Sequence, residues 1–146
     1  MRPLQLKLTG INSYREEQII DFETLTSQGL FGIFGPTGSG KSSILDAMTL
    51  ALYAKLPRDT KNFINTNEKK ANVSFLFSIT TDKTRKYLAE RSFRYHTGTS
   101  ASTVRNTTGR LILYEGDTET VLADKPTEVT NECIRLLGLT SEDFMR

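Results

Sequence analysis

The stretch that decides the fold of this chain is Gly35-Pro36-Thr37-Gly38-Ser39-Gly40-Lys41-Ser42. It fits the pattern G-x-x-x-x-G-K-[ST] of the phosphate-binding loop found in nucleotide hydrolases and kinases. The flanking sequence fits the same motif, because an apolar run over residues 30–34 precedes the loop and helix-forming residues 43–48 follow it. The sequence therefore predicts a strand, a phosphate-binding loop and a helix in this order. The alternative is a Gly/Ser-rich turn that matches the pattern by chance.

The residue types of the loop suit the binding of a triphosphate. Successive backbone N–H groups that face one concavity supply donors to the phosphate oxygens, and glycine at 35, 38 and 40 leaves room for that approach. A helix that begins near Lys41 adds unpaired N–H groups and the positive end of its dipole. We expect the Lys41 ammonium to reach the β- and γ-phosphates and the Ser42 hydroxyl to take one position on Mg²⁺.

Composition and charge place limits on the class of protein. The 146 residues amount to one domain with a core, and the net charge of +2 is too small to imply nucleic-acid binding. The charge is unevenly distributed, because acidic residues dominate from Glu115 to the end. We expect that the basic middle of the chain can face a polyanion, although exposed strands also carry such residues for solubility. The basic residues concerned are Lys83, Arg85, Lys86, Arg91, Arg94, Arg105 and Arg110.

The single cysteine and the absence of long apolar runs exclude other classes. Cys133 has no cysteine partner for an internal disulfide or a cysteine-based zinc site, and it falls on the apolar stripe of a predicted helix. We therefore expect it to be a small core residue. No run approaches the ~18 apolar residues of a membrane span, and the first residues resemble a strand and not a signal peptide. A cytoplasmic protein without a membrane partner is the expectation.

Hydrophobic periodicity predicts strands, two helices and one long loop. The helix after the phosphate loop is apolar on nearly every side, so it belongs inside a domain, and Pro57 is expected to close it. Residues 96–109 have no periodic apolar face and are expected to form a mobile loop. A second helix is expected from Pro126 to a stop at Gly138. The predicted strands are Leu4–Leu8, residues 18–22, a strand from Gly29, and two hairpins that pair residues 73–79 with 87–95 and 111–114 with 120–122.

A catalytic acid is harder to find than the phosphate loop. Hydrolysis needs an acid that orients Mg²⁺, usually at the end of a second apolar strand. Glu115 follows such a run, but Tyr114 stands where Asp is expected and Gly116 favours a hairpin turn. Asp46 is expected to be a helix-surface or packing residue, and the only histidine, His96, has no visible catalytic partner. We expect none of the three to be catalytic.

Several stretches closely resemble the N-terminal ATPase half of the SbcC family, the bacterial members of the SMC-related, ABC-type DNA-repair ATPases. The resemblance implies an α/β P-loop NTPase fold, in which residues 1–146 are the N-terminal lobe of an ABC-type ATPase head with a mixed sheet and an antiparallel β-rich subdomain. It implies that a glutamine loop begins after Arg146, and that a coiled coil, a zinc hook and a C-terminal lobe lie elsewhere in a long polypeptide. The matching stretches are residues 29–53, Leu4 to Phe22 with Asn12-Ser13-Tyr14, residues 121–125 and residues 137–144.

The resemblance also implies roles for residues and partners. Lys41 would act in catalysis through the phosphates, Ser42 would bind Mg²⁺, and Asn12 and Ser13 match a turn near the nucleotide. The C-terminal lobe would bring the Mg²⁺-binding Asp, the catalytic Glu, the signature motif and the switch His. Two heads would close on ATP as a homodimer and drive an SbcD-like nuclease subunit that acts on double-stranded DNA. The ATP-binding residues carried over by position are Gly35, Pro36, Thr37, Gly38, Ser39, Gly40, Lys41, Ser42 and Ser43.

Two other functions stay open at this point. One is a small stand-alone phosphotransferase with Glu115 or Asp46 on the metal. The other is a DNA-binding or protein-interaction lobe in which the phosphate loop is only structural. A variant of Lys41 distinguishes them, since it would remove ATP binding from either enzyme and change nothing in an interaction lobe.

Overall fold

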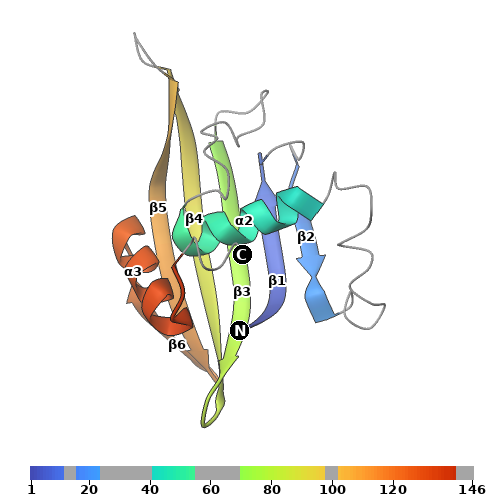
Figure 1. Cartoon of the computed structure of the whole chain (residues 1–146), viewed down its shortest axis with the longest axis vertical. Helices are drawn as coiled ribbons and strands as arrows, with labels where there is room; N and C mark the ends of the chain where they lie inside the picture. Colours follow the sequence, from blue (N-terminus) through green and yellow to red (C-terminus); the bar gives the residue numbers. More distant parts are fainter. Residues whose placement is uncertain (12–15, 24–40, 55–69, 98–101, 141–146) are drawn as a thin grey trace.

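The computed structural model of the chain describes residues 1–11, 16–23, 41–54, 70–97 and 102–140. These residues form one six-stranded sheet and two helices (Figure 1). Every neighbouring pair of strands is antiparallel, and the order across the sheet is β2-β1-β3-β4-β5-β6. The elements are β1 (Arg2–Thr9), β2 (Gln18–Asp21), α2 (Lys41–Tyr53), β3 (Lys70–Thr80), β4 (Thr84–Thr97), β5 (Ser102–Glu115), β6 (Thr118–Ala123) and α3 (Pro126–Leu137).

Alternation of side chains gives the sheet one apolar face. Leu6 and Leu8 of β1 are almost completely buried, and so are Phe75 and Phe77 of β3, whose rings stack with centroids 5.3 Å apart. Lys7, between the two leucines, and Leu76, between the two phenylalanines, point to the other face, because successive side chains of a strand alternate. The predicted strands over Leu4–Leu8 and residues 73–79 are therefore confirmed.

Both described helices lie on the apolar face of the sheet. α2 crosses the strands, and α3 lies beside it against β5 and β6 (Figure 1). Ala47, Leu50, Ala51 and Leu52 of α2 are all 0% exposed, which confirms the prediction of an internal helix. The helix ends at Tyr53 because Ala54 takes a left-handed conformation with φ 58°. The predicted stop at Pro57 lies outside the described residues.

The C-terminal end of α2 is capped by a buried side chain of the sheet, Arg91 of β4. Arg91 is only 2% exposed, and its guanidinium donates from all five N–H groups. Nε donates to the Ala51 carbonyl at 2.8 Å, and Nη2 donates to the Leu52 carbonyl at 3.0 Å. The other three acceptors are Asn106 Oδ1 at 2.7 Å, the Pro126 carbonyl at 3.0 Å and Thr130 Oγ1 at 2.7 Å.

Dipoles, not a carboxylate, compensate the buried charge of Arg91. Ion pairs among the described residues involve other side chains, and all five acceptors of Arg91 are carbonyl, amide or hydroxyl oxygens. The last carbonyls of a helix lack partners within it and carry the negative end of its dipole, so a cation is favourable there. Burial lowers the pKa of Arg91 to about 10, because desolvation penalises the charged form, and the group stays protonated at neutral pH.

The prediction of a mobile loop over residues 96–109 is wrong for residues 96–97 and 102–109, and residues 98–101 lie outside the described residues. β4 continues to Thr97 and β5 begins at Ser102, and the two strands pair up to Thr97 and Ser102 at the tip of a long hairpin. The hairpin extends beyond the neighbouring strands (Figure 1). Threonine and valine favour extended backbone, and main-chain hydrogen bonds hold the ladder without the buried side-chain face that the periodicity argument required.

The second half of the chain otherwise follows the prediction. β5 and β6 form a hairpin around Gly116, and α3 begins with Pro126 and ends at Gly138 in a left-handed conformation with φ 68°. Cys133 is 0% exposed in the core as expected, and burial raises the pKa of its thiol to about 12. The predicted strand from Gly29 lies outside the described residues. The antiparallel part of the expected fold is thus observed, and the mixed sheet stays a prediction.

The Arg91→Met variant tests the importance of the cap. Methionine keeps much of the side-chain length but leaves five acceptors, two in buried and three in part-buried hydrogen bonds, without their donor. We therefore expect the free energy of unfolding to fall by at least about 3 kcal/mol. Urea denaturation followed by circular dichroism measures it. Arg94→Met is the matched control on the same strand, because Arg94 is exposed, and should change stability by less than about 0.5 kcal/mol. Equal stability of the two variants would contradict the cap.

Candidate nucleotide-binding site

The N-terminal end of α2 is the part of the predicted phosphate site that the structure describes. The helix begins at Lys41, so the last two residues of the loop motif, Lys41 and Ser42, lie in its first turn. The first N–H groups of a helix have no partner within it and point, with the positive end of the dipole, toward any anion placed before them. The first turn of α2 contains no acidic side chain that would compete for these groups. This end of the helix therefore suits a phosphate.

The structure describes only some of the residues that were predicted to bind phosphate. The main chain of Lys41, Ser42 and Ser43 lies in the first turn of α2. Gly35, Pro36, Thr37, Gly38, Ser39 and Gly40 lie outside the described residues, as do Asn12 and Ser13. Their assignment to ATP stays a prediction from the sequence.

The body of α2 is fixed firmly behind this end. Asp46 is 2% exposed and Thr49 is 0% exposed, and both are engaged in interactions inside the protein. The expectation of Asp46 as a packing residue is confirmed, and its alternative as a helix-surface residue is wrong. The cause is that α2 is covered on nearly every side, so a position opposite its apolar residues is also enclosed.

The chain just before Asn12 is held against the start of β3. Gly10 has φ 71°, and a Cβ at this position would lie 2.5 Å from the Lys70 carbonyl oxygen. A glycine is therefore required for this close approach. Ile11, the next residue, is 0% exposed in the core that also contains Leu50.

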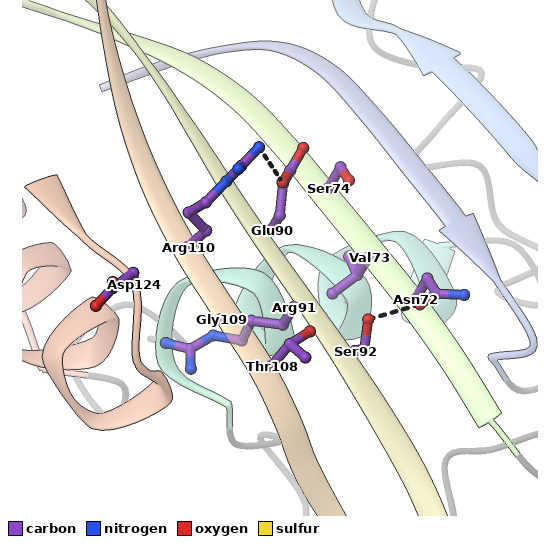
Figure 2. A pocket seen from close by; sticks show the side chains of 10 residues that line it. All are labelled: Asn72, Val73, Ser74, Glu90, Arg91, Ser92, Thr108, Gly109, Arg110 and Asp124. Carbon is purple, nitrogen blue, oxygen red and sulfur yellow. Dashed lines mark hydrogen bonds and ion pairs between the residues drawn. The ribbon is translucent and has the colours of Figure 1, made fainter. Parts of the chain in front are cut away.

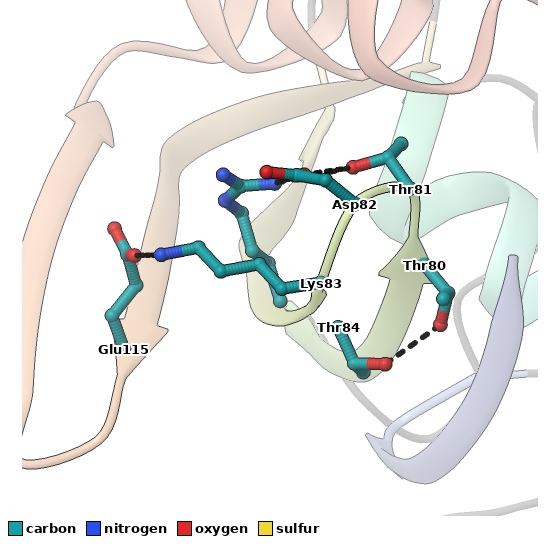
Figure 3. A network of polar contacts seen from close by, with 7 residues as sticks. Thr80, Thr81, Asp82, Lys83, Thr84 and Glu115 are labelled. Atoms are coloured by element: carbon teal, nitrogen blue, oxygen red, sulfur yellow. Dashed lines mark hydrogen bonds and ion pairs between the residues drawn. The ribbon is translucent and has the colours of Figure 1, made fainter.

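Glu115 lies on an exposed hairpin and is paired with a lysine. Its carboxylate accepts a hydrogen bond from Lys83 Nζ at 2.9 Å, and this contact lowers the pKa of Glu115 (Figure 3). Beside it, Asp82 accepts from Thr81 and Arg85, which lower its pKa to about 2 (Figure 3). The network belongs to the β3–β4 turn and the end of β5. The geometry supports the expectation that Glu115 is not catalytic.

The basic residues between 83 and 110 do not form one polyanion-binding face. Arg91 is buried under the helices, which contradicts its place in that set, because its position in β4 has the same parity as the buried Ala89 and Phe93. Lys86 and Arg94 are exposed on the opposite face. The ion pairs are Lys83–Glu115 at 2.9 Å, Arg85–Asp82 at 3.2 Å and Arg110–Glu90 at 3.4 Å.

Two shallow cavities lie on the face of the sheet opposite the helices. The first, of about 370 Å³, contains the Arg110–Glu90 ion pair and the hydrogen bond from Ser92 to Asn72 (Figure 2). The second, of about 410 Å³, is lined by residues that include Lys7 and Tyr114. Neither cavity includes a residue of α2. We therefore place the candidate site at the helix end and not in these cavities.

Arg91 lies on the same strand face as Phe93, as expected from the alternation, but its place among the residues that could face a polyanion is wrong. The alternation of Tyr87, Ala89 and Phe93 placed position 91 on the inward face, and this signal was available in the sequence. The charge of arginine suggested solvent or a polyanion as its partner. His96 pairs through its main chain with Thr103 in the β4–β5 ladder, and its side chain lies outside what the structure describes.

Comparison with known proteins identifies relatives over the whole chain. Residues 5–137 match the family model described as an AAA domain. Over its whole length the chain is 44% identical to the SbcC subunit of the SbcCD nuclease of Clostridium acetobutylicum and 49% identical to that of Bacillus subtilis, and it covers 12% and 13% of their lengths. Over 64% of the chain it is 42% identical to a protein of Aquifex aeolicus named probable DNA double-strand break repair Rad50 ATPase, of which it covers 10%.

Neither α2 nor α3 is long and apolar enough to cross a bilayer.

The Glu115→Gln variant tests the position of the catalytic acid. In the whole protein that contains these residues, we expect ATP turnover to stay within about twofold of the parent, because the side chain belongs to an exposed ion pair. Steady-state phosphate release measures it. Glu119→Gln, at an exposed position of β6, is the control. A tenfold loss in Glu115→Gln alone would restore the catalytic assignment of Glu115.

Proposed function

We propose, from the premise that this chain belongs to the AAA domain family and to its SbcC-like members, that residues 1–146 form the N-terminal lobe of an ABC-type ATPase head and bind ATP with Mg²⁺. One observation carries the proposal. α2 begins at Lys41, within the last two residues of the loop motif, and its first turn holds no competing carboxylate. The N-terminal end of a helix suits a phosphate group.

Each residue of the loop has a defined role in this proposal. The main chain of residues 35–43 surrounds the phosphates, and the Lys41 ammonium binds the β- and γ-phosphates as a point charge. The Ser42 hydroxyl holds Mg²⁺, which supplies charge neutralisation at the β- and γ-phosphates when bound. Asn12 and Ser13 approach the nucleotide from the turn after β1.

The proposed site is one part of a composite site. The chain spans about an eighth of the length of the relatives it matches, so the remaining groups have ample sequence from which to come. We assign the Mg²⁺-binding Asp, the catalytic Glu and the switch His to the protein's own C-terminal lobe, and the signature motif to a second head. In this scheme two heads close on ATP and reopen after hydrolysis, because ATP has a higher affinity for the closed dimer.

The proposed partner is an SbcD-like nuclease subunit that acts on double-stranded DNA. Two relatives are named as the SbcC subunit of the SbcCD nuclease, which supports a place in such a complex. The ATPase would control access to DNA ends and hairpins in repair and recombination in the cytoplasm, and the cleavage chemistry would belong to the partner. No specific observation on the described residues favours direct DNA contact by the basic residues between positions 83 and 110.

The two alternatives lose support from the geometry. A stand-alone phosphotransferase needs Glu115 or Asp46 on the metal. Glu115 is ion-paired at an exposed turn and Asp46 is enclosed within the protein. An interaction lobe with a structural loop does not account for the residue types at positions 38, 40, 41 and 42, which suit a phosphate.

The Lys41→Ala variant tests the proposed function. Loss of the ammonium removes a charge from the phosphates, so we expect ATP affinity to fall by at least about tenfold. Isothermal titration of Mg·ATP into the whole protein measures the affinity. Lys86→Ala, an exposed lysine of β4, is the matched control and should bind ATP as the parent does. Equal affinity of all three proteins would exclude this loop as the ATP site and favour the interaction lobe.

A further inference from the structure

The last turn of α2 is connected to both ends of α3. Arg91 contacts Ala51 and Leu52 on one side and Pro126 and Thr130 on the other. It therefore joins the carbonyl end of α2 to the first turn of α3. Separately, the Tyr53 hydroxyl donates to the Leu139 carbonyl at 3.0 Å, just beyond the C-terminal end of α3.

The connection through Arg91 has no freedom to slide. Each of its N–H groups has one acceptor, so a shift of either helix would leave a buried donor or carbonyl unpaired. The Thr130 hydroxyl accepts from Arg91 and donates to the Pro126 carbonyl at 3.2 Å, which fixes the direction of its own hydrogen bond. Asn106 is held likewise, because its Nδ2 donates to the carbonyls of Ser92 and Thr108 while its Oδ1 accepts from Arg91.

A glycine in β5 allows the first turn of α3 to lie close to the sheet. Gly109 lies opposite Arg91 in the β4–β5 ladder, and a Cβ at this position would lie 3.0 Å from Pro126 Cα. The absence of a side chain thus lets the first turn of α3 lie directly on β5, within reach of the guanidinium. Val129 and Cys133 of α3 are both 0% exposed against the same core as α2.

We propose that Arg91 is a positioning residue that ties α3 to the phosphate-binding helix, so that ATP binding at the N-terminal end of α2 is transmitted to α3. The inference rests on the proposed function, because it takes the N-terminal end of α2 as the nucleotide site. It extends that function, because nucleotide bound at the N-terminal end of α2 would change the stability of α3 through contacts at the C-terminal end of α2.

The proposed coupling depends on the rigidity of α2. A helix of 13 residues is about 20 Å long, and α2 is packed as a single unit. Contacts with the phosphates at one end restrict its motion, and the hydrogen bonds at the other end extend this restriction to α3. ATP thereby favours the arrangement in which α2 and α3 are both ordered, and the stability of α3 becomes coupled to nucleotide binding.

Amide hydrogen exchange of α2 and α3, with and without the Mg²⁺ complex of a non-hydrolysable ATP analogue, measures this coupling. The experiment uses the whole protein that contains these residues. Thr130→Val removes one acceptor of Arg91 on the α3 side while both α2 carbonyls remain, and Thr130→Ser restores the hydroxyl. Tyr53→Phe is a milder second variant that removes only the bond to Leu139. Arg94→Met is the control for an arginine of β4 outside the network.

We expect the variants to differ in how nucleotide changes amide exchange in α3, and not in how it changes exchange in α2. In the parent, Thr130→Ser and Arg94→Met, nucleotide should slow exchange in both α2 and α3 by at least about threefold. In Thr130→Val the slowing should persist in α2 and weaken by at least about twofold in α3, with analogue affinity unchanged within about twofold. It should not vanish, because Arg91 still donates to the Pro126 carbonyl. Tyr53→Phe should lose the slowing only in the last turn of α3. A structural role alone would alter basal exchange and leave the response to nucleotide.

Two other results would overturn the inference. Slowing in α3 of Thr130→Val equal to that of the parent would show that the hydrogen bond from Arg91 to Thr130 does not transmit the nucleotide state. A parent in which only α2 responds would show that no contact between the two helices transmits it. Failure of the proposed function is distinguishable from both, because then neither helix of the parent would respond to the analogue. That outcome removes the site itself and the coupling with it.

Discussion

The arrangement of the two helices on the sheet depends on a buried guanidinium whose hydrogen-bond partners are uncharged oxygen atoms. An isolated charge inside a protein is costly, and a missing acceptor would leave part of that cost uncompensated. Arg91 meets the requirement with five acceptors drawn from the end of α2, the start of α3 and the neighbouring strand β5. These segments are far apart in sequence. Their relative positions are therefore restricted to those that satisfy all five N–H groups together.

This constraint gives the two ends of α2 opposite electrostatic tasks. The carbonyl end accepts hydrogen bonds from the Arg91 cation of the sheet, and the N–H end follows the predicted phosphate loop in sequence. The helix dipole favours both arrangements, since it is positive at its beginning and negative at its end. A helix held in this way can present its first turn to a nucleotide without reorganising, which is a condition for strong phosphate binding.

The sequence predicted the parts of the fold that depend on local pattern. The start of α2 followed from the loop motif, and the limits of α3 followed from Pro126 and Gly138. The end of α2 could not be predicted, because the left-handed residue there is Ala54 and not the glycine that usually marks such a position. Residues 96–97 and 102–109 were misassigned, since their mostly polar sequence has no periodic apolar signal although their main chains pair in the β4–β5 ladder, with one register shift.

The candidate site shows the same division between local and long-range information. Phosphate-loop chemistry can be inferred from eight consecutive residues, because each acts through main chain or a short side chain. The role of Arg91 requires knowledge of which helix lies above it, and this information resides in residues 40 positions before it and 39 positions after it. Most of the described strands and helices were thus predictable from the sequence, and the connection between the two helices was not. The phosphate loop stays a prediction.

The central claim is that these residues form a nucleotide-binding half of a composite site. Phosphate release from Mg·ATP by the isolated chain of residues 1–146, compared with the whole protein at equal concentration of sites, tests it most directly. The account predicts that the isolated chain binds ATP and releases no phosphate above background, while the whole protein turns over. Steady phosphate release by the isolated chain, abolished by Lys41→Ala, would contradict the account and show that the residues needed for hydrolysis are already present.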